Sequence, residues 1–375
     1  MSKKIKIIDL FSGVGGLSYG FSHDDKFDII AANEILKNMA KSYELNHPMV
    51  KMYCKDIRDF GIEDLTKDFG LKEGEIDLII GGPPCQAYST VGKRSLADSR
   101  GKLFNEYHRV LKEFKPKVFL FENVKGLLSI QKGCLLLEIV SLFESLGYEV
   151  VFKILNVADY GVPQMRERVI IIGTKLKTNF KYPQPTHYIG KKNYDILNEK
   201  NKRYLTLREA IGDLPLIKSG EESLIYESVP LNDFQRLMRK NAPEKLMDHN
   251  APKNNKQLVK LMEALPDGGS PKDLPQVMRP KSGFANTYSR LWWDKPSATI
   301  TRNLSTPSSS RCIHPKAARA LTTREGARVQ CFPDDYIFYG SKSDKNLQIG
   351  NAVPTFLSNA LKEAIKQHFL ENNIF

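Results

Sequence analysis

Cysteine is scarce in this sequence, and long apolar runs are missing. Only 5 of the 375 residues are cysteine, at positions 54, 85, 134, 312 and 331, and no two of them form a CxxC pair. An odd number of scattered thiols argues against a disulfide framework and a structural zinc site, and it favours a reducing cytosol. No stretch approaches the roughly 20 apolar residues that span a bilayer. The lysine-rich start runs into a segment broken by Asp9 rather than a secretory signal. We therefore expect a cytoplasmic protein without a membrane segment or a metal.

Positive charge is in excess and unevenly distributed. The chain has 56 Lys and Arg against 43 Asp and Glu, a net charge of +13. Residues 181–320 carry about +10 of this excess, and residues 1–180 carry only about +3. An excess of that size in one segment suggests a polyanionic partner for that segment, although a merely solvated surface explains the charge equally well.

Residues 5–180 alternate short apolar runs with amphipathic stretches. The expected strands are Ile5–Leu10, Asp28–Ala32, Ile76–Gly81, Val118–Glu122, Glu149–Leu155 and Arg168–Gly173, with helices between them such as Ile35–Asn46, Leu103–Phe114 and Leu135–Leu146. This alternation predicts an α/β fold with a doubly wound, mostly parallel sheet, in which ligands bind at the carboxyl ends of the strands. Residues 181–320 lack the rhythm and predict a second, irregular domain, and residues 355–369 regain helical periodicity.

The first expected strand ends in a glycine-rich turn, Asp9-Leu-Phe-Ser-Gly-Val-Gly-Gly. Its three glycines allow a tight turn and a close approach of the backbone to a ligand, although an ordinary strand–helix turn has the same composition. Glu34 ends the second strand, where it could accept hydrogen bonds from ribose hydroxyls, and Asp56 could accept one from an adenine amino group. The spacing departs from GxGxxG and suits a cofactor without a pyrophosphate, which favours S-adenosylmethionine over NAD.

Cys85 directly follows an expected buried strand, in Gly81-Gly-Pro-Pro-Cys. Most cysteines are inert core residues, and we expect that of the other four. Cys85 differs because two glycines and two prolines constrain its loop at a strand end. A catalytic thiol needs a depressed pKa and hence nearby cations, which Arg166 and Arg168 could supply. Glu122, at the end of the next strand, could act as a proton donor or a hydrogen-bonding partner.

Together these motifs resemble the DNA (cytosine-5) methyltransferases of bacterial type II restriction–modification systems. The resemblance covers nearly the whole chain, in the order of the family. Its motifs are the cofactor loop 9–16, the ribose acid Glu34, the adenine contact at 56–57, the nucleophile loop 82–86, the cytosine-binding motif 122–124, the arginine pair in 164–168, the motif 319–333 that supports the recognition domain, and the last motif 348–354. The departures are Tyr88, where Phe or Trp is usual, and Cys331, where a small residue is more common.

The resemblance implies a Rossmann-like S-adenosylmethionine-dependent methyltransferase. Residues 1–180 with 343–375 would form the catalytic and cofactor-binding domain, and residues 181–342 an inserted target-recognition domain. The thiolate of Cys85 would add to C6 of a flipped-out cytosine, Glu122 would hold its N3 edge, Arg168 would neutralise charge at O2, and Arg166 would support the thiolate or order the loop. The implied cofactor-binding residues are Asp9, Phe11, Gly13, Gly15, Gly16, Glu34, Ile35, Asp56, Ile57, Pro83, Leu103, Asn351 and Val353.

The implied partner is double-stranded DNA, bound by a monomer associated with the nucleoid. The candidate DNA-binding residues are Ser89, Lys93, Arg94 and Arg100 in the loop after the nucleophile, and Arg290 and Arg302 in the basic segment. Methylation would protect host DNA from a cognate restriction enzyme. Two alternatives stay open: a transfer-RNA cytosine-5 methyltransferase, and a DNA-binding regulator without catalysis. An NAD-dependent oxidoreductase is disfavoured by the spacing of the glycine loop.

Overall fold

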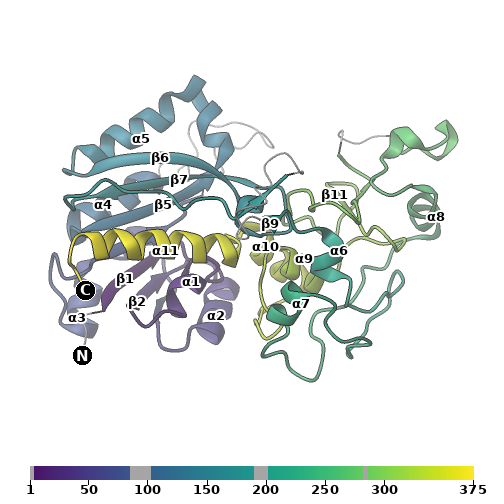
Figure 1. Ribbon diagram of the computed structural model, residues 1–375, viewed down its shortest axis with the longest axis horizontal. Helices are drawn as coiled ribbons and strands as arrows, with labels where there is room; N and C mark the ends of the chain where they lie inside the picture. The colour runs from purple at the N-terminus through teal and green to yellow at the C-terminus, as the bar shows by residue number, and fades with distance from the viewer. Residues whose placement is uncertain (1–3, 85–102, 190–201, 282–285) are drawn as a thin grey trace. The chain divides into compact units, whose positions relative to one another are not determined.

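The computed structural model describes residues 4–84, 103–189, 202–281 and 286–375, which form two compact units (Figure 1). The first unit comprises Met1–Asn156, Glu167–Gln184 and Leu357–Phe375, and the second comprises Val157–Arg166 and Pro185–Phe356. These units differ from the expected domains in three segments, because residues 157–166 and 343–356 belong to the second unit and residues 181–184 belong to the first. Hydrogen bonds explain the difference: the guanidinium of Arg166 donates to carbonyls of Ile300 and Gly350, and Gln164 bonds Gln330.

The first unit is built on one seven-stranded sheet in the order β3-β2-β1-β4-β5-β7-β6. The strands are β1 Ile5–Leu10, β2 Phe27–Asn33, β3 Lys51–Tyr53, β4 Leu78–Gly81, β5 Val118–Val124, β6 Glu149–Asn156 and β7 Glu167–Thr174. Only β7 runs antiparallel to its neighbours β5 and β6. The predicted α/β class with a mostly parallel sheet is confirmed. The three-residue strand β3 was not among the expected strands.

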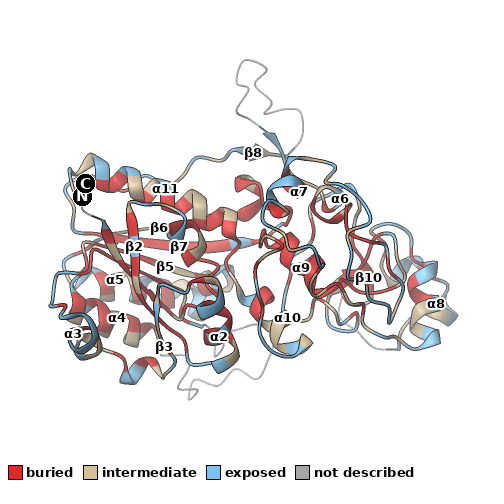
Figure 2. Cartoon of the chain, turned by 90° about the horizontal axis from the view of Figure 1, so that it is seen from below, coloured by how far each residue is buried: buried red, intermediate tan, exposed pale blue. Residues whose placement is uncertain are grey.

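Helices cover both faces of this sheet (Figure 2). They are α1 Ser18–Ser22, α2 Lys37–Asn46, α3 Ile62–Phe69, α4 Leu103–Phe114, α5 Cys134–Glu144 and α11 Thr355–Glu371, with short 3₁₀ turns at Ile57–Asp59 (η1) and Lys125–Gly133 (η4). The helices α3, α4 and α5 enclose an aromatic-rich core against one face, in which Phe119, Phe121 and Phe143 are fully buried. On the other face α11 packs beside α1, where the backbone N–H of Gly20 donates to Ser358 Oγ at 3.0 Å.

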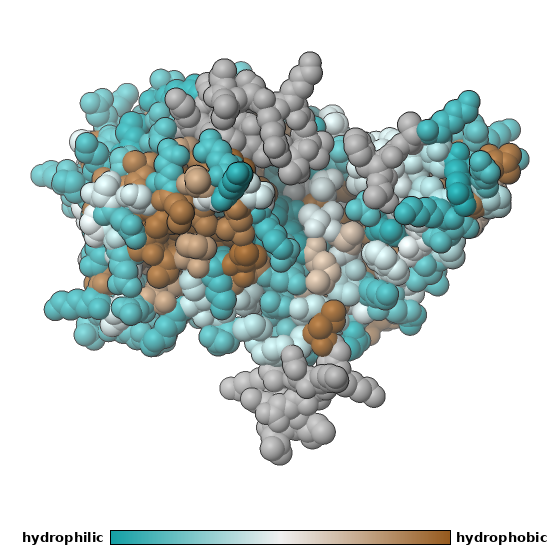
Figure 3. All heavy atoms as spheres, turned by 90° about the horizontal axis from the view of Figure 1, so that it is seen from above, coloured by the Kyte–Doolittle hydropathy of each residue, from teal (hydrophilic) through white to brown (hydrophobic). Residues whose placement is uncertain are grey.

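One stretch of the described residues, Lys125–Glu144, is long and apolar enough by composition to cross a membrane. It is not one continuous helix, because Gln131 and Lys132 have positive φ and separate η4 from α5. The inner face of α5 packs into the core, and apolar side chains stay exposed on its outer face, such as Leu137 at 65%, and on β6, such as Phe152 at 45%. This apolar surface is visible on the first unit in Figure 3. The segment is therefore a core helix preceded by a turn.

The second unit has little regular structure. Its helices are α6 Leu207–Ile211, α7 Asp233–Met238, α8 Lys256–Ala264, α9 Thr323–Val329 and α10 Lys342–Asn351, with 3₁₀ turns at Val157–Tyr160, Pro271–Asp273 and Gln276–Met278. Its strands form two small parallel pairs, β8 His187–Tyr188 with β9 Lys202–Arg203, and β10 Ser289–Arg290 with β11 Arg311–Ile313. The irregular character expected for this part of the chain matches these short elements.

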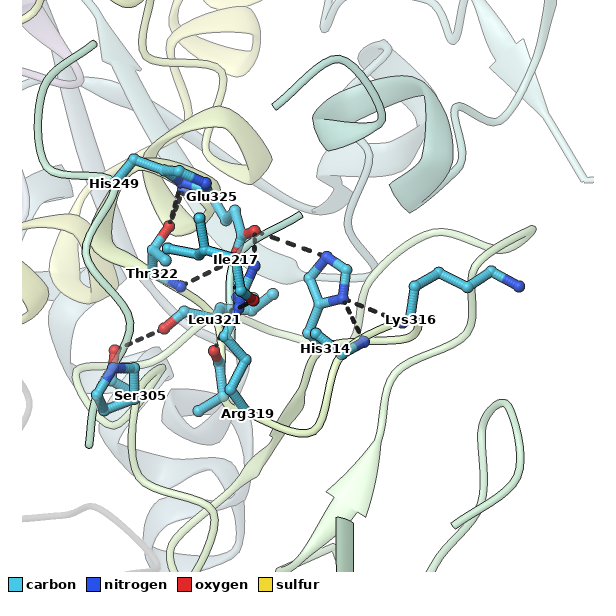
Figure 4. Close-up of polar contacts among 12 residues, drawn as sticks. Ile217, His249, Ser305, His314, Lys316, Arg319, Leu321, Thr322 and Glu325 are labelled. Carbon is cyan, nitrogen blue, oxygen red and sulfur yellow. Dashed lines mark hydrogen bonds and ion pairs between the residues drawn. The ribbon is translucent and has the colours of Figure 1, made fainter. Parts of the chain in front are cut away.

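Buried ion pairs stabilise the centre of the second unit (Figure 4). The guanidinium of Arg319 forms two hydrogen bonds of 2.7 and 2.8 Å with the carboxylate of Glu325, and both side chains are at most 1% exposed. Glu325 also accepts the N–H of Thr322 at 2.8 Å and lies 3.6 Å from His314 Nε2. Burial alone would raise the pKa of Glu325, but Arg319 and His314 hold it below its ordinary value. A second network joins Arg328 to Asp213 and Asp334.

We expect Arg319→Met to lower the free energy of unfolding by about 3–5 kcal/mol, because it leaves a buried carboxylate without its cation. Urea denaturation measures the change. The exposed pair of Arg236 with Asp233 provides the control, and Arg236→Ala should change stability little. The double variant R319M/E325L removes both charges and should recover part of the loss. A double variant as unstable as the sum of its single variants would contradict this account.

Candidate active site

The candidate site lies at the carboxyl ends of β1, β2, β4 and β5. β1 pairs with β2 on one side and with β4 on the other, and all three strands are parallel. Strand order reverses at this point, which is where parallel sheets of this kind bind ligands. The glycine loop follows β1, Glu34 follows β2, and Gly82 follows β4, so the topology brings these predicted residues to one edge of the sheet.

Several residues of the glycine loop have positive φ angles. Gly13 has φ +56° and Gly15 has φ +89°, and Phe11, between β1 and the glycines, has φ +54°. A Cβ placed on Gly13 would meet no atom within 4 Å, so the backbone here faces open space. The loop therefore offers a surface on which a ligand could lie against the main chain. Gly16 is buried where the loop leads into α1.

Glu34 is tied to the glycine loop by its own carboxylate. Its Oε2 accepts the N–H of Gly13 at 3.0 Å, and its Oε1 accepts the N–H of Leu36 at 2.8 Å. Burial raises the pKa of this carboxyl, and the backbone hydrogen bonds from Leu36 and Gly13 oppose the rise. A carboxylate offers about four acceptor positions, and the backbone N–H groups of Gly13, Ile35 and Leu36 do not fill all of them, so acceptor capacity for a diol remains. Ile35 beside it is 57% exposed, as a face for a planar ring would be.

Asp56 caps the short turn η1. Its Oδ1 accepts the N–H of Arg58 at 3.0 Å, and its Oδ2 lies 3.3 Å from Nη1 of the same arginine. The side chain is half-buried, while Ile57 next to it is buried and its carbonyl accepts a hydrogen bond from Arg109 at 2.7 Å. The capping role fixes the orientation of the Asp56 carboxylate and leaves part of its acceptor capacity unused.

Asp9 is the most deeply buried carboxyl of the site, with 1% of its surface exposed. Its Oδ2 accepts a hydrogen bond from Ser18 Oγ at 2.6 Å, and Ser18 Oγ lies 2.7 Å from Tyr43 Oη. Burial raises the pKa of Asp9 from 3.8 to about 8. The Ser18 hydrogen bond opposes this rise, and the Glu34 carboxylate adds to it. Asp9 therefore lies behind the loop as a neutral acid that connects β1 to α1 and α2.

The ends of β4 and β5 meet through close backbone packing. A Cβ on Gly82 would lie 2.8 Å from Glu122 Oε2, so only glycine lets the chain pass here without displacing the carboxylate. Asn123 Nδ2 donates to the carbonyl of the buried Pro83 at 3.0 Å. Cys85 itself lies outside the described residues. The two residues that precede Pro84 in its loop are thus packed against Glu122 and Asn123.

Glu122 and Arg168 form an ion pair. Arg168 Nε lies 2.7 Å from Glu122 Oε1, and the two side chains are 10% and 13% exposed. Glu122 lies inside β5, opposite Ile170 of the antiparallel strand β7, and this pairing brings the start of β7 to the site. Arg168 also donates through Nη1 to the carbonyl of Glu167 at 2.8 Å. Glu122 and Arg168, which were predicted separately from their own motifs, are therefore paired in the structure.

Arg166 belongs to the second unit and is 2% exposed. Its Nη1 donates to the carbonyl of Ile300 at 2.7 Å, and its Nη2 donates to those of Gly350 and Ala352 at 3.0 and 3.3 Å. The last two carbonyls flank Asn351, which is exposed at the end of α10, before Val353. These hydrogen bonds fix the segment that carries Asn351. Because Cys85 lies outside the described residues, support of its thiolate or ordering of its loop by Arg166 stays a prediction.

The predicted DNA contacts divide into three groups. Arg302 is exposed, as such a contact requires. Arg290 is 5% exposed and donates to the carbonyls of His314 and Pro315 at 2.6 and 2.8 Å, so the prediction that it contacts DNA is not supported. Its guanidinium stabilises the fold of the second unit through these hydrogen bonds. Four further candidates lie outside the described residues: Ser89, Lys93, Arg94 and Arg100.

Two further predictions concern Leu103 and the binding of a metal ion. Leu103 is half-buried at the start of α4. In the part of the chain that the structure describes, no group of three His, Cys, Asp or Glu side chains could hold a metal ion. Two residues with clear roles at the site were not singled out from the sequence, Asn33 and Asn123. The signal for each is an asparagine that ends an apolar strand next to a predicted acid.

Comparisons with known proteins agree with this geometry. Residues 5–367 match the family model of the C-5 cytosine-specific DNA methylases. The chain is 34% identical to the type II methyltransferase M.AgeI of Thalassovita gelatinovora, over 96% of this chain and 99% of the relative. It is 37% identical to M.DdeI of Desulfomicrobium norvegicum, over 99% and 90%. Its structure resembles a protein from an E. coli prophage described as a DNA modification methyltransferase, with a TM-score of 0.75, 25% identity and coverage of 97% and 99%.

We expect Asp9→Asn to change the pH dependence of stability. The unfolded carboxyl ionises near pH 4 and the folded one near pH 8, so between these values the unfolded state gives up a proton that the folded state keeps. Wild-type stability therefore falls as pH rises through this window. The free energy of unfolding of the variant minus that of the wild type should increase by about 1 kcal/mol per pH unit.

Urea denaturation between pH 4 and pH 9 measures this difference for the protein without ligands. Ser18→Ala is the matched control, because it removes the hydrogen-bond partner and keeps the carboxyl, so its profile should retain the wild-type decline. Parallel profiles for Asp9→Asn and the wild type would show that Asp9 is ionised in the folded protein.

Proposed function

The chain belongs to the C-5 cytosine-specific DNA methylases, and from this premise we propose that it methylates C5 of a cytosine within a specific duplex DNA sequence. S-adenosylmethionine would be the methyl donor. The observation that carries the proposal is the Glu122–Arg168 ion pair. Glu122 lies against the backbone of Gly82, and the adjacent Asn123 bonds the carbonyl of Pro83, in the segment that leads to Cys85. A carboxylate and a cation beside the loop of a nucleophile are the groups that activation of cytosine requires.

The residues at the ends of β1, β2 and β3 fit S-adenosylmethionine. The open backbone at Gly13 leaves room for a ligand, and Glu34 keeps acceptor capacity for the ribose hydroxyls. Asp56 would accept from the adenine amino group, with Ile35 and Ile57 on either side. The proposed contacts of Phe11, Gly15, Pro83, Leu103, Asn351 and Val353 complete the set. When bound, this cofactor supplies an electrophilic methyl group.

The chemistry on the base follows from the weakness of C5 as a nucleophile. The Cys85 thiolate forms a bond to C6, and the electron pair of the C5–C6 double bond becomes available at C5 as in an enamine. Glu122 would hold the N3 edge and Arg168 would face O2, where negative charge grows. After C5 has taken the methyl group, loss of its proton and release of Cys85 as thiolate restore the double bond.

The target atom lies within the base stack, so the cytosine must leave the duplex, at a cost of a few kcal/mol. We assign DNA contacts to Arg302 and to the loop residues Ser89, Lys93, Arg94 and Arg100. The second unit would serve target recognition, acting from a monomer in the cytoplasm at the nucleoid. Methylation of one sequence would protect host DNA from a cognate restriction enzyme, the role that the names of its type II relatives suggest.

The relatives argue against the two alternatives. Several type II methyltransferases align with almost the whole chain at 34–37% identity, whereas the likeness to the S. pombe Dnmt2 methyltransferase, at 18% identity, extends to the fold alone. A regulator without catalysis would have no need of a buried Glu122–Arg168 pair next to the segment that leads to Cys85. DNA methylation is therefore the function that the site supports best.

We expect Cys85→Ala to abolish methyl transfer and to leave sequence-specific DNA binding intact, because the thiolate is needed for the addition to C6 and not for recognition. Bisulfite sequencing of DNA from cells that express the protein measures methylation and reveals the target. Gel shift with that target measures binding.

Cys134→Ala is the matched control, since Cys134 is an exposed cysteine outside the site, and it should methylate like the wild type. Activity of Cys85→Ala at the wild-type level would refute the covalent mechanism. Transfer of radiolabel from the cofactor to tRNA and not to DNA would refute the choice of substrate.

A further inference from the structure

We propose that Asn33 is a positioning residue that sets the distance between Glu34 and Asp56, and thereby the affinity and selectivity for the adenosine part of the cofactor. This inference rests on the proposed function, since it assigns the two carboxylates to the ribose and the adenine. Asn33 would not touch the ligand. It acts through the segments that carry the residues that do.

Asn33 is the last residue of β2 and is 2% exposed. Both hydrogens of its side-chain amide are used: Nδ2 donates to the carbonyl of Tyr53 at 3.0 Å and to that of Lys55 at 2.9 Å. The ladder between β2 and β3 consists of three residue pairs and ends at Asn33 and Tyr53. The amide extends the connection by two residues, as far as the residue directly before Asp56.

The backbone of Asn33 connects the same point to the glycine loop. Its carbonyl accepts the N–H of Ser12 at 3.0 Å, one residue before Gly13. The next residue, Glu34, donates its N–H to the carbonyl of Tyr53 at 3.2 Å and accepts Gly13 N–H through its side chain. Three segments that are distant in the sequence, 11–16, 34 and 55–57, are thus fixed to one residue. They are the segments to which the proposed function assigns the cofactor.

The donors of the asparagine side chain make Asn33→Asp a selective test of this connection. Aspartate has nearly the same volume, but it lacks both donors and would place a negative charge next to two carbonyl oxygens. Asn33→Asp therefore disrupts the link to Lys55 without creating a cavity. The backbone hydrogen bond from Ser12 does not depend on the side chain, so the glycine loop should keep its place while the Asp56 segment moves.

Calorimetric titration with S-adenosylhomocysteine and with S-inosylhomocysteine, which lacks the adenine amino group, tests the proposal on the full chain. For the wild type we expect clear preference for the adenosyl compound. For Asn33→Asp we expect the dissociation constant of S-adenosylhomocysteine to rise about tenfold or more, and the ratio between the two ligands to fall towards one. In methylation assays the KM for the cofactor should rise while kcat at saturation stays within about twofold.

A double-mutant cycle with Asp56→Asn separates positioning from general destabilisation. If Asn33 acts through Asp56, Asp56→Asn weakens binding in the wild type and adds little in the Asn33→Asp background. Thr174→Val is the matched control. It removes a buried hydrogen bond to His368 at 2.8 Å, and Thr174 pairs with Val118 at the opposite end of the sheet. It should lose stability and keep the ligand ratio.

The outcomes test the positioning role of Asn33 and the proposed function separately. Additive effects, or an unchanged ligand ratio in Asn33→Asp, would overturn the role of Asn33 and leave the proposed function intact. A wild-type protein that binds neither ligand would instead overturn the proposed function. Should Asn33→Asp fail to fold, Asn33→Ser keeps one donor, and it should give a ratio between those of the wild type and one; a wild-type ratio would likewise reject the proposal.

Discussion

The reversal of strand order between β1 and β4 is the constraint on which the candidate site depends. The chain first builds outward from β1 to β2 and β3, and then returns to the other side of β1 to build β4 and β5. Crossovers between parallel strands are right-handed, so the two halves of the sheet carry their helices on opposite faces. The loops after β1 and β4 consequently diverge, and polar groups that would otherwise be covered lie at the carboxyl edge. The positions of the glycine loop, Glu34 and Gly82 at one edge of the sheet follow from this reversal.

The two units satisfy the hydrogen bonds of their buried backbone groups in different ways. The first satisfies its backbone through the strand ladder and packs aromatic side chains on it. The second has few ladder hydrogen bonds, so buried carbonyls need other donors. Arginine supplies up to five N–H groups on one side chain, and Arg166, Arg290 and Arg319 each donate to main-chain carbonyls. Part of the positive charge of residues 181–320 is therefore structural and does not face a polyanion.

This division explains which predictions from sequence succeeded. Strand and helix positions in the first unit followed from periodic apolar residues. Glu122 and Arg168 were each singled out from a motif at a strand end, but their ion pair was not predicted. The three-residue strand β3 has too few residues to show a period. Arg290 was misjudged because a buried arginine and an exposed one are identical in a sequence. What distinguishes them is the position of carbonyls such as that of His314, 24 residues away along the chain, and only the folded structure gives that position.

The number of polar atoms that each side chain leaves unused separates residues that bind from residues that position. Asn33 donates both amide hydrogens to carbonyls, and Arg290 donates to carbonyls through both Nη atoms, so these donors serve the fold. Glu34 accepts backbone N–H groups through both carboxylate oxygens and still keeps part of its acceptor capacity. Arg168 meets Glu122 through Nε and gives one Nη1 bond to a carbonyl, so donors on its outer edge remain for a substrate. Equal burial can therefore accompany opposite roles, and the balance of donors and acceptors is the reason why we propose Glu34 and Arg168 as ligand-binding residues and Asn33 as a positioning residue.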